Sequence, residues 1–295
     1  MGCNQLLVQI LFVFQCMTGN PVMWPEGEPP AIMLPREPSP EPEIVMPPLP
    51  RPRPPHEVEV VVPEPAPYAE TIASVLGSST VYIDLFQNGD GPTYVALHSD
   101  EDIGVKAAST LPGTHVTLRH DGERNVAFNF KGVRYEFDPN RMFTQVGIEK
   151  TLRAQSDGRY SAEAHAIVAS LARAVLERIQ SGKPIVALHN NTNGQYSIES
   201  YLNDGSEASN TKYININPGS DPDDFFLTTS PQWFGELKAL GYNVVLQASN
   251  PVDDGSLSVY AELNGISYVN VEAEKDRRES LEVQRQMLLA LQDIL

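Results

Sequence analysis

Two stretches of similar sequence decide the fold expected for this chain: TYVALHSDED (residues 93–102) and PIVALH (residues 184–189). Each begins as a short apolar run that leads directly into a histidine, His98 in the first and His189 in the second. Apolar runs of this length, bounded by turn residues, are typical of buried strands. Both histidines are therefore expected where a strand ends.

Strand-like and helix-like patterns alternate on both sides of these two stretches. We expect further strands at 80–86, 115–120, 125–130, 133–137, 243–247 and 267–274, and helices at 102–111, 161–182, 231–241 and 278–295. This alternation predicts an α/β fold with a mixed, largely parallel central sheet flanked by helices. Such folds place their sites at the carboxyl ends of strands, which is where both histidines fall.

The composition divides the chain into three parts. Residues 1–19 contain the apolar run LLVQILFVF, which is too short to span a bilayer and suits an export signal or anchor, although no Lys or Arg precedes it. Residues 20–67 hold 17 of the 25 prolines, which predicts a disordered, extended linker. Residues 68–295 are expected to form one folded domain. We expect a monomer that is exported, either periplasmic or tethered to a membrane of the cell envelope through its N-terminus.

Charge and cysteine content narrow the possible partners and metal ligands. The formal net charge of −17 argues against nucleic acid as a partner, because a phosphate backbone repels an acidic surface. Both cysteines, Cys3 and Cys16, lie in the first 19 residues. The folded domain therefore has no disulfide, and any metal must be held by histidine and carboxylate side chains.

Three residues at the strand ends could form a metal site. Glu101 follows His98 by three residues, so both side chains could converge on one ion if the chain turns into a helix there. With His189 they would offer the nitrogen and oxygen ligands that zinc accepts, with one position left for water. The spacing H-x-x-E is common by itself, and Glu101 could instead be a solvated acid in the first turn of a helix.

The segment RYEFDPNRMF (residues 134–143) carries a resemblance to a known family. Its Arg-Tyr and Asp-x-Asn-Arg-x-Phe pattern resembles the substrate-binding segment of aspartoacylases and succinylglutamate desuccinylases, which belong with the zinc carboxypeptidases of the funnelin type. The order of motifs in that superfamily is H-x-x-E, Asn-Arg, His and a catalytic Glu, and it is found here from about Tyr94 to Glu274. The resemblance implies a zinc carboxypeptidase-like domain over residues 68–295 that hydrolyses an amide or peptide bond with bound Zn²⁺.

The resemblance also implies a role for each matched residue. The zinc ligands would be His98, Glu101 and His189. Glu272 would be the general base, and Arg134 would stabilise the oxyanion. Asn140 and Arg141 would bind a substrate carboxylate. These roles suit amide hydrolysis, which needs an activated water, a base and a cation for the oxyanion.

Several assignments stay open. Glu274 lies on the same face of a strand as Glu272, so it could be the base or a second acid near the substrate. Arg124 is an alternative to Arg134, although it lies in the turn DGER. Tyr260 could contact substrate, as a tyrosine does in carboxypeptidases, or pack in the core. The segment NNTNG (190–194) could line the pocket, but a tight turn is the favoured interpretation.

Three functions fit the sequence. Only 23 residues follow Glu272, so we expect no additional C-terminal domain of the kind that narrows the aspartoacylase site. A more open site favours a carboxypeptidase that acts on peptides with a free carboxylate, including cell-wall peptides. The first alternative is a deacylase of N-acyl amino acids, and the second, of another class, is a non-catalytic binding domain on a proline-rich stalk.

Overall fold

A computed structural model describes residues 69–295 of the chain. The expected leader (1–19) and proline-rich linker (20–67) lie outside the described residues. Within the described range, no helix combines the length and the apolar character needed to cross a bilayer.

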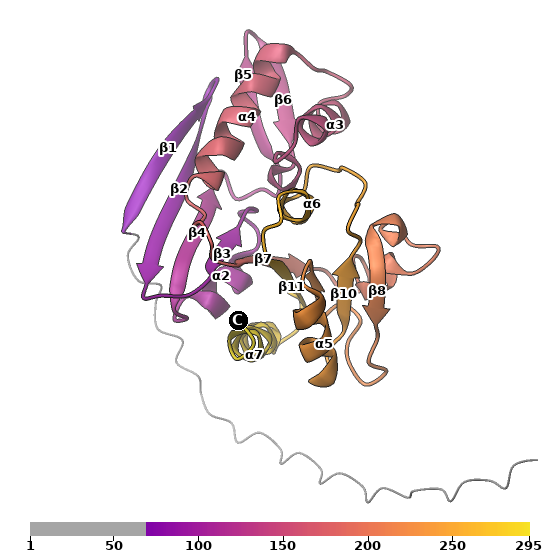
Figure 1. Ribbon diagram of the computed structural model, residues 1–295. Helices are drawn as coiled ribbons and strands as arrows, with labels where there is room; N and C mark the ends of the chain where they lie inside the picture. The colour runs from indigo at the N-terminus through magenta and orange to yellow at the C-terminus, as the bar shows by residue number, and fades with distance from the viewer. Residues whose placement is uncertain (1–68) are drawn as a thin grey trace, which may run out of the picture. The chain divides into compact units, whose positions relative to one another are not determined.

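A nine-stranded sheet forms the centre of the domain (Figure 1). In spatial order its strands are β1 (Glu70–Leu76), β2 (Ser79–Asn88), β4 (Gly113–Arg119), β3 (Thr93–Ala96), β7 (Ile185–Asn191), β11 (Tyr268–Glu274), β9 (Phe225–Thr228), β10 (Val244–Gln247) and β8 (Thr211–Asn215). The pairs β4–β3, β3–β7, β7–β11 and β9–β10 are parallel and the other pairs are antiparallel. Consequently β1, β3, β4, β7, β8 and β11 run in one direction, which agrees with the expected mixed, largely parallel sheet.

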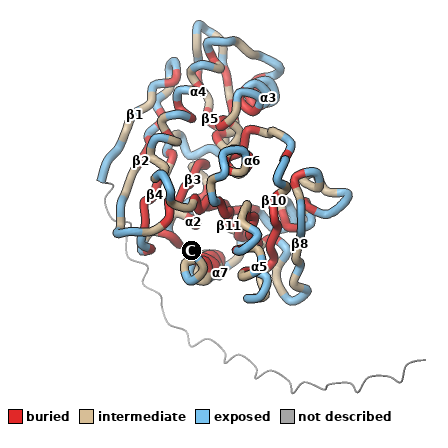
Figure 2. Tube along the Cα trace, viewed as in Figure 1, coloured by how far each residue is buried: buried red, intermediate tan, exposed pale blue. Residues whose placement is uncertain are grey.

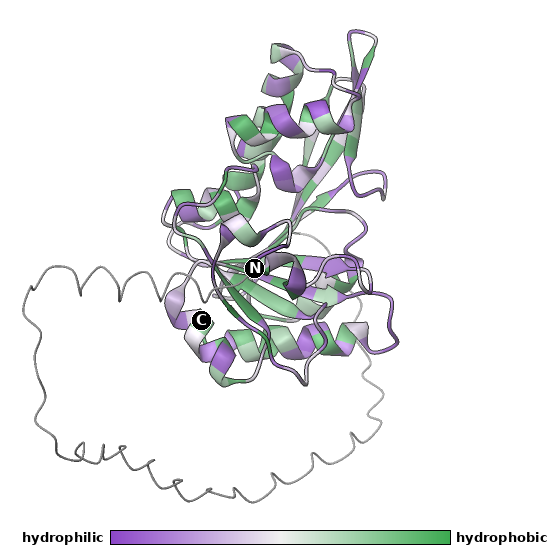
Figure 3. Ribbon diagram, turned by 90° about the vertical axis from the view of Figure 1, so that its right-hand side faces the viewer, coloured by the Kyte–Doolittle hydropathy of each residue, from purple (hydrophilic) through white to green (hydrophobic). Residues whose placement is uncertain are grey.

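The central strands are buried on both faces, and the edge strands are not (Figure 2). Every residue of β7 and β11 is buried, whereas β1 and β8 are mostly exposed or half-buried. Figure 3 shows the central strands as a largely hydrophobic run. Because side chains alternate along a strand, Val269, Val271 and Ala273 of β11 enter one core, and Asn270 and Glu272 point to the other face.

Helices cover both faces of the sheet. On one face α2 (Asp102–Ala108), α5 (Pro231–Ala239) and α7 (Ser280–Gln292) pack over a core that includes Val186, Phe226 and Val271. On the other face lie α4 (Ala162–Leu176) and α6 (Leu257–Leu263), together with the hairpin of β5 (Val126–Phe130) and β6 (Val133–Phe137), on which α3 (Gln145–Gln155) packs. The candidate site lies on this second face.

Side-chain caps mark the start of several helices. The hydroxyls of Thr144, Ser161 and Ser230 accept hydrogen bonds from the first-turn amides of α3, α4 and α5. Such caps satisfy amide groups that have no partner within the helix.

Each expected strand and helix is present. Strands β1, β8 and β9 and helices α3 and α6 were not predicted. The four-residue β9 is too short for a periodic signal, and β8 is a half-exposed edge strand. Helix α3 is mostly polar and contains Gly147, so its sequence pattern is weak.

Candidate active site

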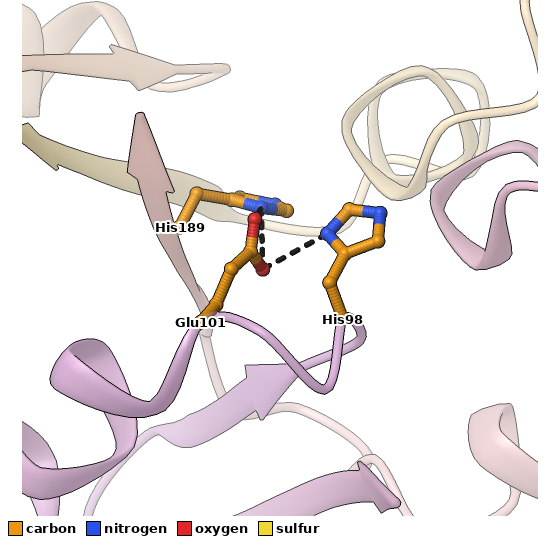
Figure 4. A group of neighbouring side chains, drawn as sticks. All are labelled: His98, Glu101 and His189. Carbon is orange, nitrogen blue, oxygen red and sulfur yellow. Dashed lines mark hydrogen bonds and ion pairs between the residues drawn. The ribbon is translucent and has the colours of Figure 1, made fainter. Parts of the chain in front are cut away.

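The two histidines and Glu101 meet on one side of the sheet (Figure 4). His98 lies in the loop after β3, Glu101 is the residue before α2, and His189 is part of β7. Because β3 and β7 are parallel neighbours, the residues at their carboxyl ends come to the same edge. All three side chains are buried, with exposed fractions of 5% or less.

The donor atoms of the three residues face one another. Nδ1 of His98 lies 2.9 Å from Oε2 of Glu101, and Nδ1 of His189 lies 3.0 Å from Oε1 of the same carboxylate. Nδ1 of His98 is buried and is not aligned for a hydrogen bond. A buried imidazole nitrogen without a hydrogen bond, next to a carboxylate and a second imidazole, is the arrangement expected of side chains that bind a divalent metal such as zinc.

The outer ring nitrogens contact residues of the segment between β6 and α3. Nε2 of His98 lies 2.8 Å from Oδ1 of Asp138, and Nε2 of His189 lies 3.5 Å from Nδ2 of Asn140. A carboxylate on the outer nitrogen fixes a histidine tautomer so that the inner nitrogen has a free lone pair. Asp138 therefore orients His98 with Nδ1 directed at Glu101.

The site concentrates charge in a buried volume. Burial lowers the pKa of His98, but the Glu101 charge and the contact with Asp138 outweigh this and raise its pKa to about 9. Burial favours a raised pKa for Glu101, but the adjacent His189 and His98 hold that pKa well below its ordinary value. Since a metal ligand must be a neutral imidazole, an ion that binds here displaces the proton of His98.

Glu272 is the acid of β11 that enters the pocket. It pairs in register with His189 on β7, its exposed fraction is 5%, and its Oε1 accepts a hydrogen bond of 3.1 Å from Nδ2 of Asn270. Burial raises the pKa of Glu272 above its ordinary value, with Glu101 adding to the effect and His189 opposing it. Glu274 does not line the pocket, and its carboxylate contacts Asn193 and Arg277 instead.

The pocket beside these residues has a volume of about 420 Å³. Its wall is polar and combines carboxylates, amides, hydroxyls and two guanidinium groups. The lining residues include Glu101, Arg124, Asn140, Arg141, His189, Tyr196, Tyr201, Glu207, Asn210, Gln247, Asp254, Ser256, Tyr268, Asn270 and Glu272.

Arg141 and Asn140 sit at this wall through a short 3₁₀ helix, η1 (Pro139–Arg141). Nη1 of Arg141 donates to the carbonyl of Asn140 at 2.7 Å, and Nε lies 3.5 Å from Oδ2 of Asp254. The side-chain oxygen of Asn140 accepts the amide of Leu257 at 3.0 Å. The side-chain amide of Asn140 therefore already has contacts within the protein. Arg141 still has guanidinium N–H groups that can bind an anion in the pocket.

The assignment of Arg134 to the oxyanion role does not fit its position. Arg134 lies on β6, its side chain is 61% exposed, and it pairs with Glu136 at 2.9 Å outside the pocket. The alternative residue, Arg124, lines the pocket, and its Nη1 lies 3.3 Å from Oε1 of Glu101. The loop between β4 and β5 therefore brings Arg124 to Glu101, which its turn-like sequence did not indicate.

Tyr260 also lies away from the pocket. It is part of α6, is partly buried against the core, and its ring centroid lies 6.3 Å from that of Phe143. The tyrosines at the pocket are Tyr196, Tyr201 and Tyr268, which the sequence did not single out. Asn190 and Asn191, interpreted as part of a turn, are the last residues of β7, and with Thr192 they line the pocket as well.

Two contacts of the site were not predicted from the sequence. Asp138 was matched only as part of the substrate-binding segment; it caps η1, and its carboxylate also contacts His98. Asn270 contacts Glu272, and it lies two residues earlier on the same strand. Alternation along β11 was a signal that could have found Asn270. No local signal links Asp138 to a histidine 40 residues away.

The sequence matches no protein-family model and no curated protein. Among solved structures, it is similar to a succinylglutamate desuccinylase/aspartoacylase from Rhodobacter sphaeroides, with 13% identity, a TM-score of 0.38, and coverage of 76% of this chain and 65% of that one. A succinylglutamate desuccinylase from Chromobacterium violaceum has 13% identity, a TM-score of 0.40, and coverage of 78% and 70%. A candidate metallopeptidase from Shewanella amazonensis SB2B has 13% identity, a TM-score of 0.35, and coverage of 76% and 85%.

The structural neighbours are desuccinylases, aspartoacylases and candidate metallopeptidases. This chain spans less than two thirds of the length of the Rhodobacter sphaeroides protein. Because these TM-scores are low, the fold and the chemistry of this chain are inferred from its own strands and side chains.

Proposed function

We propose that this chain is a metal-dependent hydrolase that cleaves an amide bond next to a free carboxylate, acting as a carboxypeptidase on peptides. The observation that carries the proposal is a His-Glu-His metal ligand set at the wall of a pocket that Glu101 and His189 line together with the buried Glu272 and two arginines. The metal set is His98, Glu101 and His189. A zinc ion held there would supply Lewis acidity and a more acidic bound water.

Each remaining residue contributes a separate part of the reaction. Glu272 accepts a proton from the attacking water and returns it to the leaving nitrogen as the carbon–nitrogen bond breaks, which suits a buried carboxyl with a raised pKa. Arg124 provides positive charge for the oxygen that becomes negative. Arg141 binds the substrate carboxylate, because its planar guanidinium can donate two hydrogen bonds at once.

A second candidate reaction uses the same atoms. An N-acyl amino acid also presents an amide next to a carboxylate, so Arg141 and Glu272 would serve a deacylase equally well. A pocket of about 420 Å³ lies in the range of pockets that hold drug-sized ligands, so it has room for a peptide larger than an N-acyl amino acid.

The test is a substrate panel with wild-type protein and one variant. C-terminal peptides, cell-wall peptide fragments and N-acyl amino acids are incubated with and without chelator. We expect chelator-sensitive hydrolysis of peptides, with Glu272→Gln retaining metal and losing turnover by a factor on the order of 10² or more. The exposed Glu149→Gln serves as the matched control.

Two results would change the proposal. Full activity in Glu272→Gln together with loss in Glu274→Gln would move the base by two residues. Metal binding without turnover of any member of the panel would favour the non-catalytic binding domain.

A further inference from the structure

A second group of carboxylates lies outside the pocket, near the carboxyl ends of β7 and β11. One oxygen each from Asp221, Asp223 and Glu274 lies within 4.8 Å of the others. Asp223 and Glu274 are 3% and 4% exposed, and Asp221 is half-buried. Buried carboxylates repel one another, so an arrangement of this kind needs a cation or shared protons.

Arg277 neutralises only part of this group. Its guanidinium donates to Asp221 at 2.9 Å and to Asp224, and lies 3.7 Å from Glu274. Among the described residues, no cationic side chain contacts Asp223. One oxygen of Asp223 accepts the amide of Gly194 at 2.9 Å, and the other is buried with no hydrogen-bond partner.

A further oxygen beside this group also lacks a partner. Asn191 pairs in register with Glu274 across β7 and β11, and its Nδ2 donates to the carbonyl of Asp223 at 2.7 Å. Its side-chain oxygen is buried with no hydrogen-bond partner, and the exposed fraction of the residue is 6%. Two buried oxygens without a hydrogen-bond partner thus belong to Asp223, a member of the group, and to Asn191, which contacts Asp223 and pairs with Glu274.

The structure points to a hard divalent cation, and we propose that Asp221, Asp223 and Glu274 bind Ca²⁺ at this second site. All the available donor atoms are oxygens, which suits Ca²⁺ rather than zinc. A surface hollow lined by Asn193, Gly194, Asp221 and Asp223 gives an ion access from solvent. This site is separate from the His-Glu-His set and does not depend on the proposed hydrolase activity.

The position of the site suggests what bound Ca²⁺ does. Gly194 contacts Asp223, and Asn193 donates to Glu274 at 3.3 Å, so the cation lies where the segment 192–196 is attached to β11. Thr192, Gln195 and Tyr196 of that segment line the active-site pocket. Ca²⁺ would therefore stabilise the wall of the pocket without contacting substrate.

The experiment is thermal unfolding of the full chain with increasing Ca²⁺, with Mg²⁺ as a parallel titration. We expect Ca²⁺ at about 100 times its dissociation constant to raise Tm by roughly 5–10 °C. Asp223→Asn should abolish the shift. Asp204→Asn, which removes one exposed charge away from the cluster, should keep it.

A double variant separates the two sites. His98→Ala with His189→Ala should retain the full Ca²⁺ shift, because neither histidine belongs to the second site. No Ca²⁺ shift in the wild type, or equal shifts in the wild type and Asp223→Asn, would overturn the proposal. If Asp223→Asn does not fold, Asp221→Asn takes its place, and an undiminished shift in that variant would overturn the proposal too.

Discussion

At His98 the two ring nitrogens have different partners. Nε2 contacts Asp138, and Nδ1 faces Glu101 and His189. The sequence predicted His98, Glu101 and His189 as a group because each lies at or just after a strand end. It did not predict Asp138 as their partner, because a turn acid next to proline has a sufficient local explanation.

The contact with Asp138 leads to a prediction at the scale of one residue. Asp138→Asn keeps the shape of the side chain but removes the charge that orients and stabilises His98. We expect metal affinity to fall by a factor of about 10–100. Competition with a fluorescent zinc chelator measures this, and Asp157→Asn in an exposed turn is the control. Unchanged affinity in Asp138→Asn would show that His98 is held without its carboxylate partner.

At the scale of elements, strand alternation and loop packing determine different parts of the site. Alternation along β11 predicted that Glu272 and Glu274 share a face, but not which one enters the pocket. That choice depends on loops that approach from elsewhere, since Asp224 accepts the amide of Glu274 at 3.1 Å and Asn193 contacts its carboxylate. Arg124 was underrated for the same reason, because a turn sequence does not reveal what the turn packs on.

The loop before α6 positions Arg141 through close backbone contact. Gly255 has a φ of +83°, and a Cβ there would lie 2.4 Å from the carbonyl oxygen of Arg141 and 2.5 Å from Cα of Gly147. We expect Gly255→Ala to destabilise the fold by about 1–3 kcal/mol and to raise KM more than it lowers kcat. Denaturant unfolding and steady-state kinetics measure both effects.

A matched glycine provides the control for this prediction. Gly235 lies within α5, where a Cβ would meet nothing within 4 Å. Gly235→Ala should therefore stabilise the protein by up to about 1 kcal/mol and leave KM unchanged. Equal behaviour of the two alanine variants would contradict a role for Gly255 in holding Arg141.

At the scale of the whole molecule, a strongly acidic chain places two of its buried histidines, His98 and His189, next to carboxylates. In the metal-free protein His98 has a folded-state pKa of about 9, above its ordinary value of 6.5. Its stabilising contribution is therefore fully present below about pH 6.5 and is lost as pH rises through about 9.

This linkage predicts a pH dependence of stability in chelator. The free energy of unfolding of the wild type should fall between about pH 6.5 and pH 9, by on the order of 1–3 kcal/mol relative to His98→Ala. Urea unfolding at a series of pH values measures it. Parallel pH profiles for the two proteins would contradict a protonated His98 in the metal-free site.

The alternating elements, the strand ends and the grouping of His98, Glu101 and His189 could be predicted from sequence because they depend on local periodicity. The positions of Arg124, Arg134, Tyr260 and Asp138 could not, because each depends on how a loop or hairpin packs against a distant part of the chain.

The most direct test of the proposed metal site is the metal content of the purified protein. We expect about one zinc per chain in the wild type and in His165→Ala, and little in His98→Ala or His189→Ala. Equal zinc in all four proteins would contradict the His98–Glu101–His189 site.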